Sequence, residues 1–142
     1  MKNSSSPKLI YLLSVADRQV QQWMKQHMPK DFPSPAQSGV LFVLNRQDGR
    51  LMGEIGEQIQ LAPSSLSGLI QRMEDADLIK RQNCPADARA TRIYLTAKSR
   101  ALIPQLIQFT HDFNQQLQED FNQQEIEIVE RWLKSLSNKF PQ

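Results

Sequence analysis

Cysteine is nearly absent from this sequence of 142 residues. Cys84 is the single thiol, so no intramolecular disulfide can form. A lone cysteine is typical of proteins that work in a reducing compartment, and we expect a cytoplasmic location. The two histidines, His27 and His111, are far in sequence from each other and from Cys84. No metal-ligand spacing results, and we expect no metal site.

Signatures of catalysis and of membrane insertion are missing as well. The sequence has no nucleophile–base spacing, no Gly-rich phosphate loop and no dinucleotide fingerprint, so we expect neither an enzyme nor a cofactor. No stretch reaches the roughly 20 apolar residues of a membrane-spanning helix, which argues against a membrane partner. Residues 1–16 faintly resemble a signal peptide, but their apolar spacing continues beyond them. We interpret a helix there and keep secretion as the alternative.

Charge is distributed unevenly, although the formal net charge is only +2. Residues 78–100 contain six basic residues and one acidic residue, whereas residues 101–130 contain six acidic residues and no Lys or Arg. A local basic patch is typical of a surface that neutralises phosphates, but a solvated surface explains it equally well. Charge alone therefore leaves nucleic-acid binding open.

Apolar residues recur at helical spacing near both ends of the chain. After a polar segment, 1–7, which we expect to be disordered, the pattern predicts one helix over 9–28. Further stripes over 102–121 and 126–136 predict two more helices, and Pro104 predicts a kink in the first of them. Helices with such long apolar stripes can complete their burial in an oligomer.

The middle of the chain predicts three helices and a hairpin. Ser34 is a suitable N-cap for the first helix, with Pro35 at its first position, and Asp48-Gly49 forms the turn that ends it. We then expect a very short strand, two helices, a strand, a polar tip and a second strand, over 51–52, 53–60, 63–76, 78–84, 85–90 and 91–95. Thr96 is a suitable N-cap for the helix that follows.

The helix predicted over 63–76 has the composition of a DNA recognition helix. The residues that face inward are Leu66, Leu69, Ile70 and Met73. The other residues of its first turn and a half have small side chains, so this end of the helix can enter a major groove about 12 Å wide. These residues are Ser64, Ser65, Ser67 and Gly68. Gln71 suits adenine, and Arg72 can reach a phosphate. For this helix alone, capping is the better explanation of a serine-rich start, but the basic hairpin that follows favours DNA.

The stretch from residue 53 to residue 102 resembles the MarR family of transcriptional regulators. The likeness rests on Gly-Glu-Ile-Gly-Glu-Gln-Ile from Gly53, Pro-Ser-Ser-Leu-Ser-Gly-Leu-Ile-Gln-Arg-Met-Glu from Pro63, Leu-Ile-Lys-Arg from Leu78, and Asp-Ala-Arg-Ala-Thr-Arg-Ile-Tyr-Leu-Thr from Asp87. The most specific element is Asp87-x-Arg89 in the hairpin. The order of helices outside the stretch fits as well, so the resemblance covers nearly the whole chain.

The resemblance implies roles for the residues of the hairpin, or wing. Arg89 is expected to enter the minor groove at the wing tip, where a guanidinium suits a narrow, negative groove. Asp87 is expected to brace the wing, with Arg72 as its candidate partner. The predicted DNA-binding set is Ser64, Ser65, Ser67, Gln71, Arg72, Asp87, Arg89 and Arg92.

Several residues depart from the family pattern. Gly68 stands where arginine is usual, and Ala62 replaces the usual serine N-cap at a cost of about 1 kcal/mol. Asp77 and Ser99 occupy positions that are often glycine, and Gln60 lies in a turn where Gly or Asn is common. These departures predict weaker DNA binding than is usual, but they leave the apolar pattern intact.

The fold expected from these observations is mainly helical with a small β-hairpin wing, an α+β winged helix-turn-helix with N- and C-terminal dimerisation helices. We divide the chain into a disordered N-terminus, an N-terminal dimerisation helix and loop, a DNA-binding lobe and C-terminal dimerisation helices, over 1–7, 8–33, 34–100 and 101–142. The resemblance implies a homodimer on a pseudo-palindromic operator in double-stranded DNA, with half-sites about 34–36 Å apart.

The sequence pattern and the family resemblance allow two functions. One is a sequence-specific transcriptional repressor that a small aromatic or phenolic ligand releases, since family members bind such anions in a cleft beside the dimer helices. Candidates for that cleft are Tyr11, Trp23, His111 and Phe113, although residues of these types are more often part of a core. The alternative is a winged helix for protein contacts with weakened or lost DNA binding, which Gly68 keeps open. Cys84 is either a redox sensor near the wing or a small hydrophobe in a strand.

Overall fold

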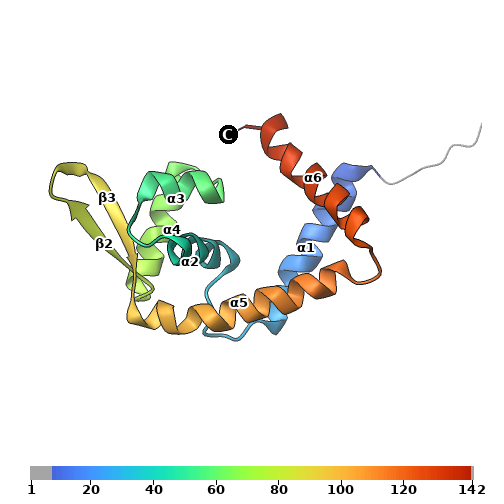
Figure 1. The fold of residues 1–142 in the computed structure, drawn as a ribbon, viewed down its shortest axis with the longest axis horizontal. Helices are drawn as coiled ribbons and strands as arrows, with labels where there is room; N and C mark the ends of the chain where they lie inside the picture. The colour runs from blue at the N-terminus through green and yellow to red at the C-terminus, as the bar shows by residue number, and fades with distance from the viewer. Residues whose placement is uncertain (1–7, 142) are drawn as a thin grey trace, which may run out of the picture. The chain divides into compact units, whose positions relative to one another are not determined.

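The computed structural model describes residues 8–141, with the side chains of Ala88 and Arg89 left out. Its elements, in chain order, are α1 (Leu9–His27), α2 (Pro35–Arg46), β1 (Arg50–Leu51), α3 (Met52–Ile59), α4 (Pro63–Asp75), β2 (Ile79–Cys84), β3 (Asp87–Leu95), α5 (Ala97–Gln118) and α6 (Gln123–Lys139), as Figure 1 shows. The chain forms two compact units, of which the first ends at Phe32 and the second begins at Pro33. The segment expected to be disordered, 1–7, lies outside the described residues.

The first unit contains α1, which carries the predicted apolar stripe but has no buried residue. Leu9 and Ile10 are exposed near its start, and Leu13 and Val15 follow them. Near its end the rings of Trp23 and His27 stack with centroids 4.2 Å apart. None of the helices in residues 8–141 is both long and apolar enough to cross a membrane.

Helix α2 is the centre of the second unit, where it contacts α3, α4, α5 and β3. The predicted cap is confirmed: the Ser34 side chain accepts a hydrogen bond from the Gln37 N–H at 3.3 Å, and the Ser34 N–H donates to Gln37 Oε1 at 3.2 Å. This reciprocal pair satisfies two backbone donors that a helix start leaves unpaired. The helix then buries the apolar residues Val40, Leu41, Val43 and Leu44.

Helices α3 and α4 form the helix-turn-helix. Gln60 ends α3 with a φ of 53°, the left-handed backbone that explains why Gly or Asn suits this turn. Gly56 brings the two helices together, because an added Cβ there would lie 2.9 Å from Leu66 Cδ2. The four residues of α4 predicted to face inward are all buried, namely Leu66, Leu69, Ile70 and Met73.

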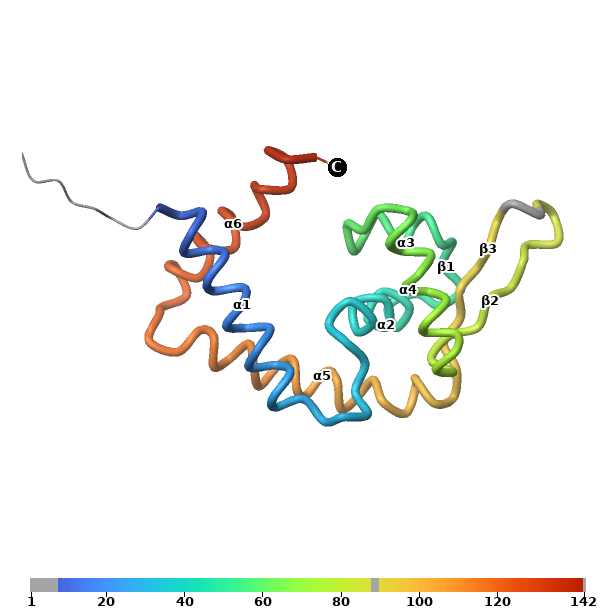
Figure 2. The backbone as a smooth tube through the Cα atoms, turned by 180° about the vertical axis from the view of Figure 1, so that it is seen from behind, coloured from blue at the N-terminus to red at the C-terminus, as the bar shows by residue number. Residues whose placement is uncertain are grey.

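The three strands form one antiparallel sheet in the order β1–β3–β2. Two of the predicted strands had the wrong bounds. The short strand is Arg50–Leu51, because Met52 is already the first residue of α3. The second wing strand begins at Asp87 rather than residue 91, because Asp87 pairs with Cys84 across a register irregularity that follows the Asn83–Thr91 pair. Figure 2 shows the resulting long β2–β3 hairpin.

Thr96 caps α5, as predicted, and its Oγ1 accepts from the Ser99 N–H at 3.1 Å. The helix passes through Pro104 without ending, and the kink there stays a prediction. Only its first half contributes to the core, through Ile103 and Leu106. Asn122 caps α6, a helix in which no residue is buried.

Candidate nucleic-acid interface

Helix α4 presents a small polar surface at its start. Ser64, Ser65 and Ser67 are all exposed, while Leu66 between them is buried and fixes which way the helix faces. Ala62 at the N-cap offers no side-chain acceptor. The first N–H groups of the helix therefore lack a cap and, together with the serine hydroxyls, can donate to phosphate or base oxygens.

Gln71, a predicted base-contacting residue, is held by its neighbours. Its Oε1 accepts a hydrogen bond from Arg81 Nη2 at 2.6 Å, and its Nε2 donates to Asp75 Oδ1 at 3.0 Å. Arg81 also pairs with Glu74, with 3.4 Å between Nε and the carboxylate. These contacts fasten α4 to β2 and use both ends of the Gln71 amide.

Arg72 is exposed, and within residues 8–141 it forms no hydrogen bond or ion pair. The bracing contact expected between Arg72 and Asp87 is accordingly not formed. Its guanidinium lies instead beside Gly68, where an added Cβ would come within 3.3 Å of Nη1. Gly68, noted above as a departure from the family pattern, leaves room for this side chain.

The wing places its predicted residues unequally. Asp87 is exposed at the start of β3, and the side chain of Arg89 lies outside the described residues. Arg92 Nη1 donates to the Gly49 carbonyl at 2.8 Å, so this arginine holds the turn before β1. Cys84 is a half-buried free thiol at the end of β2.

Most of the basic residues between 78 and 100 stabilise the lobe itself. Arg81 and Arg92 are engaged as described, Lys98 Nζ donates to the Ala76 carbonyl at 2.9 Å, and Arg100 Nη2 donates to Asp48 Oδ2 at 2.7 Å. Of the remaining two, Lys80 is exposed and Arg89 has no described side chain. The basic run in the sequence therefore supplies fewer available cations than its count suggests.

Asp48 and Asp77 are structural residues that sequence reasoning did not identify as such. Asp48 Oδ1 accepts from the Leu95 N–H at 2.9 Å, which ties the turn before β1 to the end of β3. Asp77 has a φ of 58°, and its carbonyl accepts from Thr96 Oγ1 at 2.7 Å. The family's preference for glycine at position 77 was the available signal, since a left-handed residue is usually glycine.

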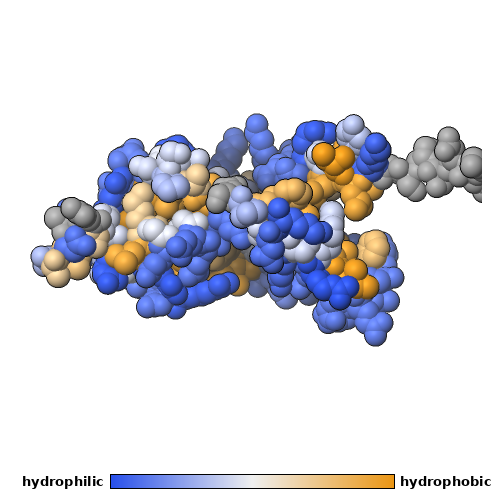
Figure 3. Space-filling view, turned by 90° about the horizontal axis from the view of Figure 1, so that it is seen from above, coloured by the Kyte–Doolittle hydropathy of each residue, from blue (hydrophilic) through white to orange (hydrophobic). Residues whose placement is uncertain are grey.

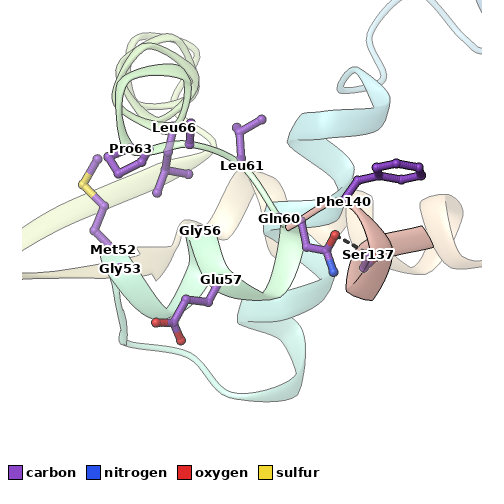
Figure 4. A pocket seen from close by; sticks show the side chains of 11 residues that line it. Met52, Gly53, Gly56, Glu57, Gln60, Leu61, Pro63, Leu66, Ser137 and Phe140 are labelled. Atoms are coloured by element: carbon purple, nitrogen blue, oxygen red, sulfur yellow. Dashed lines mark hydrogen bonds between the residues drawn. The ribbon is translucent and has the colours of Figure 1, made fainter. Parts of the chain in front are cut away.

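A cleft of about 660 Å³ adjoins the start of α4. It is lined by α3, by the turn between α3 and α4, by the first turn of α4 and by the end of α6, as Figure 4 shows. Ser137 Oγ donates to Gln60 Oε1 at 3.0 Å and joins α6 to the turn. The lining is largely apolar, with Met52, Leu61, Leu66 and Phe140, and Glu57 is its one ionisable side chain.

The residues expected to line a ligand cleft belong to both units. Tyr11 and Trp23 lie on α1 in the first unit, and His111 and Phe113 lie on α5 in the second. Phe113 is half-buried and packs near Phe109, with ring centroids 6.3 Å apart. A ligand site formed by these four side chains stays a prediction.

Known proteins resemble this chain in sequence and in fold. The sequence pattern of the MarR family matches residues 33–90. The HTH-type transcriptional regulator MhqR of Bacillus subtilis is 31% identical over 98 residues, which are 69% of this chain and 68% of that protein.

Solved structures agree over nearly the whole chain. The S. aureus MepR–DNA complex has a TM-score of 0.85 at 21% identity and covers 94% of this chain and 99% of that one. PcaV of Streptomyces coelicolor, in complex with its natural ligand, has a TM-score of 0.85 at 17% identity and covers 93% of each chain. The chain belongs to the MarR family, a non-enzymatic family of winged helix-turn-helix, DNA-binding transcriptional regulators.

Proposed function

We propose that this protein is a cytoplasmic homodimer that binds a pseudo-palindromic operator and represses transcription until a small molecule releases it. One observation carries the proposal: α4 exposes Ser64, Ser65, Ser67 and Arg72 beside the β2–β3 hairpin, and its buried residues fix that orientation. A helix that faces solvent with small polar side chains and one unpaired guanidinium suits a major groove. Arg89 in the hairpin would reach the adjoining minor groove.

A second copy of the chain would cover apolar surface that the helices leave exposed. In α6, Ile128, Val129 and Leu133 are 56%, 47% and 43% exposed, and in α1 Leu9 and Ile10 exceed half. Figure 3 shows apolar surface open to solvent on the face that it views. Burying such side chains stabilises by about 1.5–3 kcal/mol each, which favours a stable dimer.

The cleft beside α4 supports release by a ligand. A volume of about 660 Å³ is in the range of small-molecule sites, and the lining includes Pro63 and Leu66 of the recognition helix. A bound molecule would therefore bias the position of α4. The lining contains no Lys, Arg or His, so the cleft favours a neutral aromatic or phenolic molecule over an aromatic anion. PcaV, a structural relative, is described in complex with its natural ligand.

Fluorescence anisotropy with the duplex upstream of the protein's own gene tests DNA binding. We expect sequence-specific binding that weakens steeply as the salt concentration is raised, because phosphate contacts release counterions. The Arg89→Ala variant should bind about 5- to 150-fold more weakly, since a specific base contact is worth roughly 1–3 kcal/mol. Unchanged affinity in that variant would show that the wing assignment is wrong.

The same titration decides the alternative, a winged helix for protein contacts. One observation favours it: four basic side chains already donate hydrogen bonds to groups of the same chain and are less available to phosphates, namely Arg81, Arg92, Lys98 and Arg100. A stable, folded dimer that binds no duplex at low ionic strength would establish that alternative and contradict the repressor.

A further inference from the structure

We propose that Arg72 reads a guanine in each operator half-site, and that Gly68 is the residue that lets it do so. The inference rests on the proposed DNA binding and assigns its sequence specificity. It differs from the expectation drawn from sequence, in which Gln71 contacts an adenine and Arg72 a phosphate.

The geometry of α4 places the Arg72 guanidinium over the middle of the exposed surface. Ser64, Gly68 and Arg72 follow one another at intervals of four residues, so they share one stripe of the helix. Side chains in a helix lean toward its N-terminus, and the guanidinium accordingly reaches back to Gly68, with Nη1 3.3 Å from where a Cβ would be. The charged group thus lies close to the serines that would enter the groove.

The surface around Gly68 does not hold the guanidinium in place. Gly68 and the nearby serines are small, and Arg72 has no hydrogen bond or ion pair to any described residue. All five N–H donors of the side chain are therefore free to bind DNA. A long side chain at 68 would occupy the space where the guanidinium lies and displace it from the position beside the serines.

Gln71 is not a competitor for base reading. Arg81 Nη2 holds its Oε1 at 2.6 Å and Asp75 accepts from its Nε2 at 3.0 Å, so a contact with adenine would first break both bonds. Leaving Arg81 without that acceptor would add to the cost. Among the side chains of α4 that are longer than serine, Arg72 is the one whose hydrogen-bond donors have no partner among the described residues.

A guanidinium whose N–H donors are unpaired is well suited to bind guanine. Two parallel N–H donors match O6 and N7 of guanine in the major groove, whereas adenine presents one acceptor and one donor at the same edge. A bidentate contact of this kind discriminates on the order of 10- to 100-fold against the wrong base pair. A phosphate contact from the same arginine would strengthen binding to every duplex equally.

The experiment begins with selection of the preferred operator from a random duplex library by the wild-type dimer. Each guanine of the selected half-site is then exchanged in turn for adenine, and separately for 7-deazaguanine, which lacks the N7 acceptor. At one symmetric position we expect the exchange for adenine to weaken binding by about 10- to 100-fold, and the 7-deaza exchange by about tenfold. In Arg72→Ala, both differences at that position should vanish.

Two variants separate this role from a general loss of binding. Gly68→Gln should reduce discrimination at the same position, because its side chain would occupy the place of the guanidinium, while the Tm stays level or rises, because glutamine favours a helix more than glycine does. Gln71→Ala should keep the guanine preference within about twofold. Size-exclusion chromatography and Tm on each variant establish that it is a folded dimer.

The result that would overturn the proposal is an equal loss of affinity for every duplex. If Arg72→Ala weakens all duplexes equally and lowers the slope of log affinity against log salt by about one, Arg72 contacts a phosphate, and only the guanine assignment fails. If the wild-type dimer selects no sequence from the library, the proposed function itself fails, and the assignment fails with it.

Discussion

Arg100 and Asp48, 52 residues apart in the sequence, form an ion pair in which Nη2 lies 2.7 Å from Oδ2. The second oxygen of Asp48 accepts the Leu95 N–H at 2.9 Å. One carboxylate thereby joins the turn before β1, the end of β3 and the first turn of α5. These bonds hold the base of the wing against the turn before β1 and the first turn of α5.

Removing the Asp48 carboxylate should cost more than removing its cation. Arg100 is 60% exposed, so the ion pair itself is worth less than about 1 kcal/mol after solvent screening. Asp48→Ala also leaves the partly buried Leu95 N–H without an acceptor, and we expect a loss of about 1–3 kcal/mol. Urea unfolding of Asp48→Ala and Arg100→Ala measures both. Equal losses would show that the Leu95 contact contributes nothing.

Asp77→Gly should stabilise the protein. Asp77 has a φ of 58°, a conformation that glycine adopts without a Cβ penalty, and its hydrogen bond to Thr96 uses the backbone carbonyl, which glycine keeps. We expect a gain of about 0.5–1 kcal/mol in the free energy of unfolding. The control is Gln58→Gly, an exposed position inside α3 where glycine should cost about 0.5–1 kcal/mol. A loss at both positions would contradict the expected effect of the left-handed backbone.

A cap at position 62 should strengthen the start of α4. Ala62 has the extended backbone of an N-cap but no side-chain acceptor. Ala62→Thr should raise the free energy of unfolding by about 1 kcal/mol, because its hydroxyl can accept an N–H of the first turn. Ala62→Val has the same shape without the oxygen and should give no such gain. If thermal unfolding shows both variants alike, capping is not what the helix lacks.

Charges in the apolar stripe of α6 should dissociate the proposed dimer. Val129→Glu and Leu133→Glu each place a carboxylate where exposed apolar side chains would meet a second copy, and burial of an unpaired charge is costly. Light scattering should report the mass of one chain. Gln124→Glu is the control, since nine residues separate it from Leu133 and place it on the opposite side of the helix. Dimers that persist in both α6 variants would show that the interface lies elsewhere.

The fold could be predicted from the sequence wherever a local rule governs it. Ser34 and Thr96 cap their helices through bonds to residues three positions away, and Leu66 and Met73 are buried because their helix has one apolar side. The start of β3 was not predicted, because Asp87 pairs with Cys84 across a register irregularity that no residue pattern marks.

The candidate site was harder to predict, because tertiary contacts decide which of its polar groups remain available. The sequence marked Gln71 and Arg92 as DNA-binding, yet Arg81 and the Gly49 carbonyl occupy them. The Gly49 partner lies 43 residues from Arg92, and no local spacing indicates it. Gly68 was among the departures that predict weaker DNA binding, and only the position of Arg72 beside it suggests a gain.

The mass of the complex on its selected operator tests the central claim most directly. Native mass spectrometry or light scattering at low ionic strength should find two chains on each pseudo-palindromic duplex, and one folded dimer when salt removes the DNA. A stable monomer, or a dimer that leaves every duplex free at low ionic strength, would contradict a protein that presents two copies of α4 and its wing to one stretch of DNA.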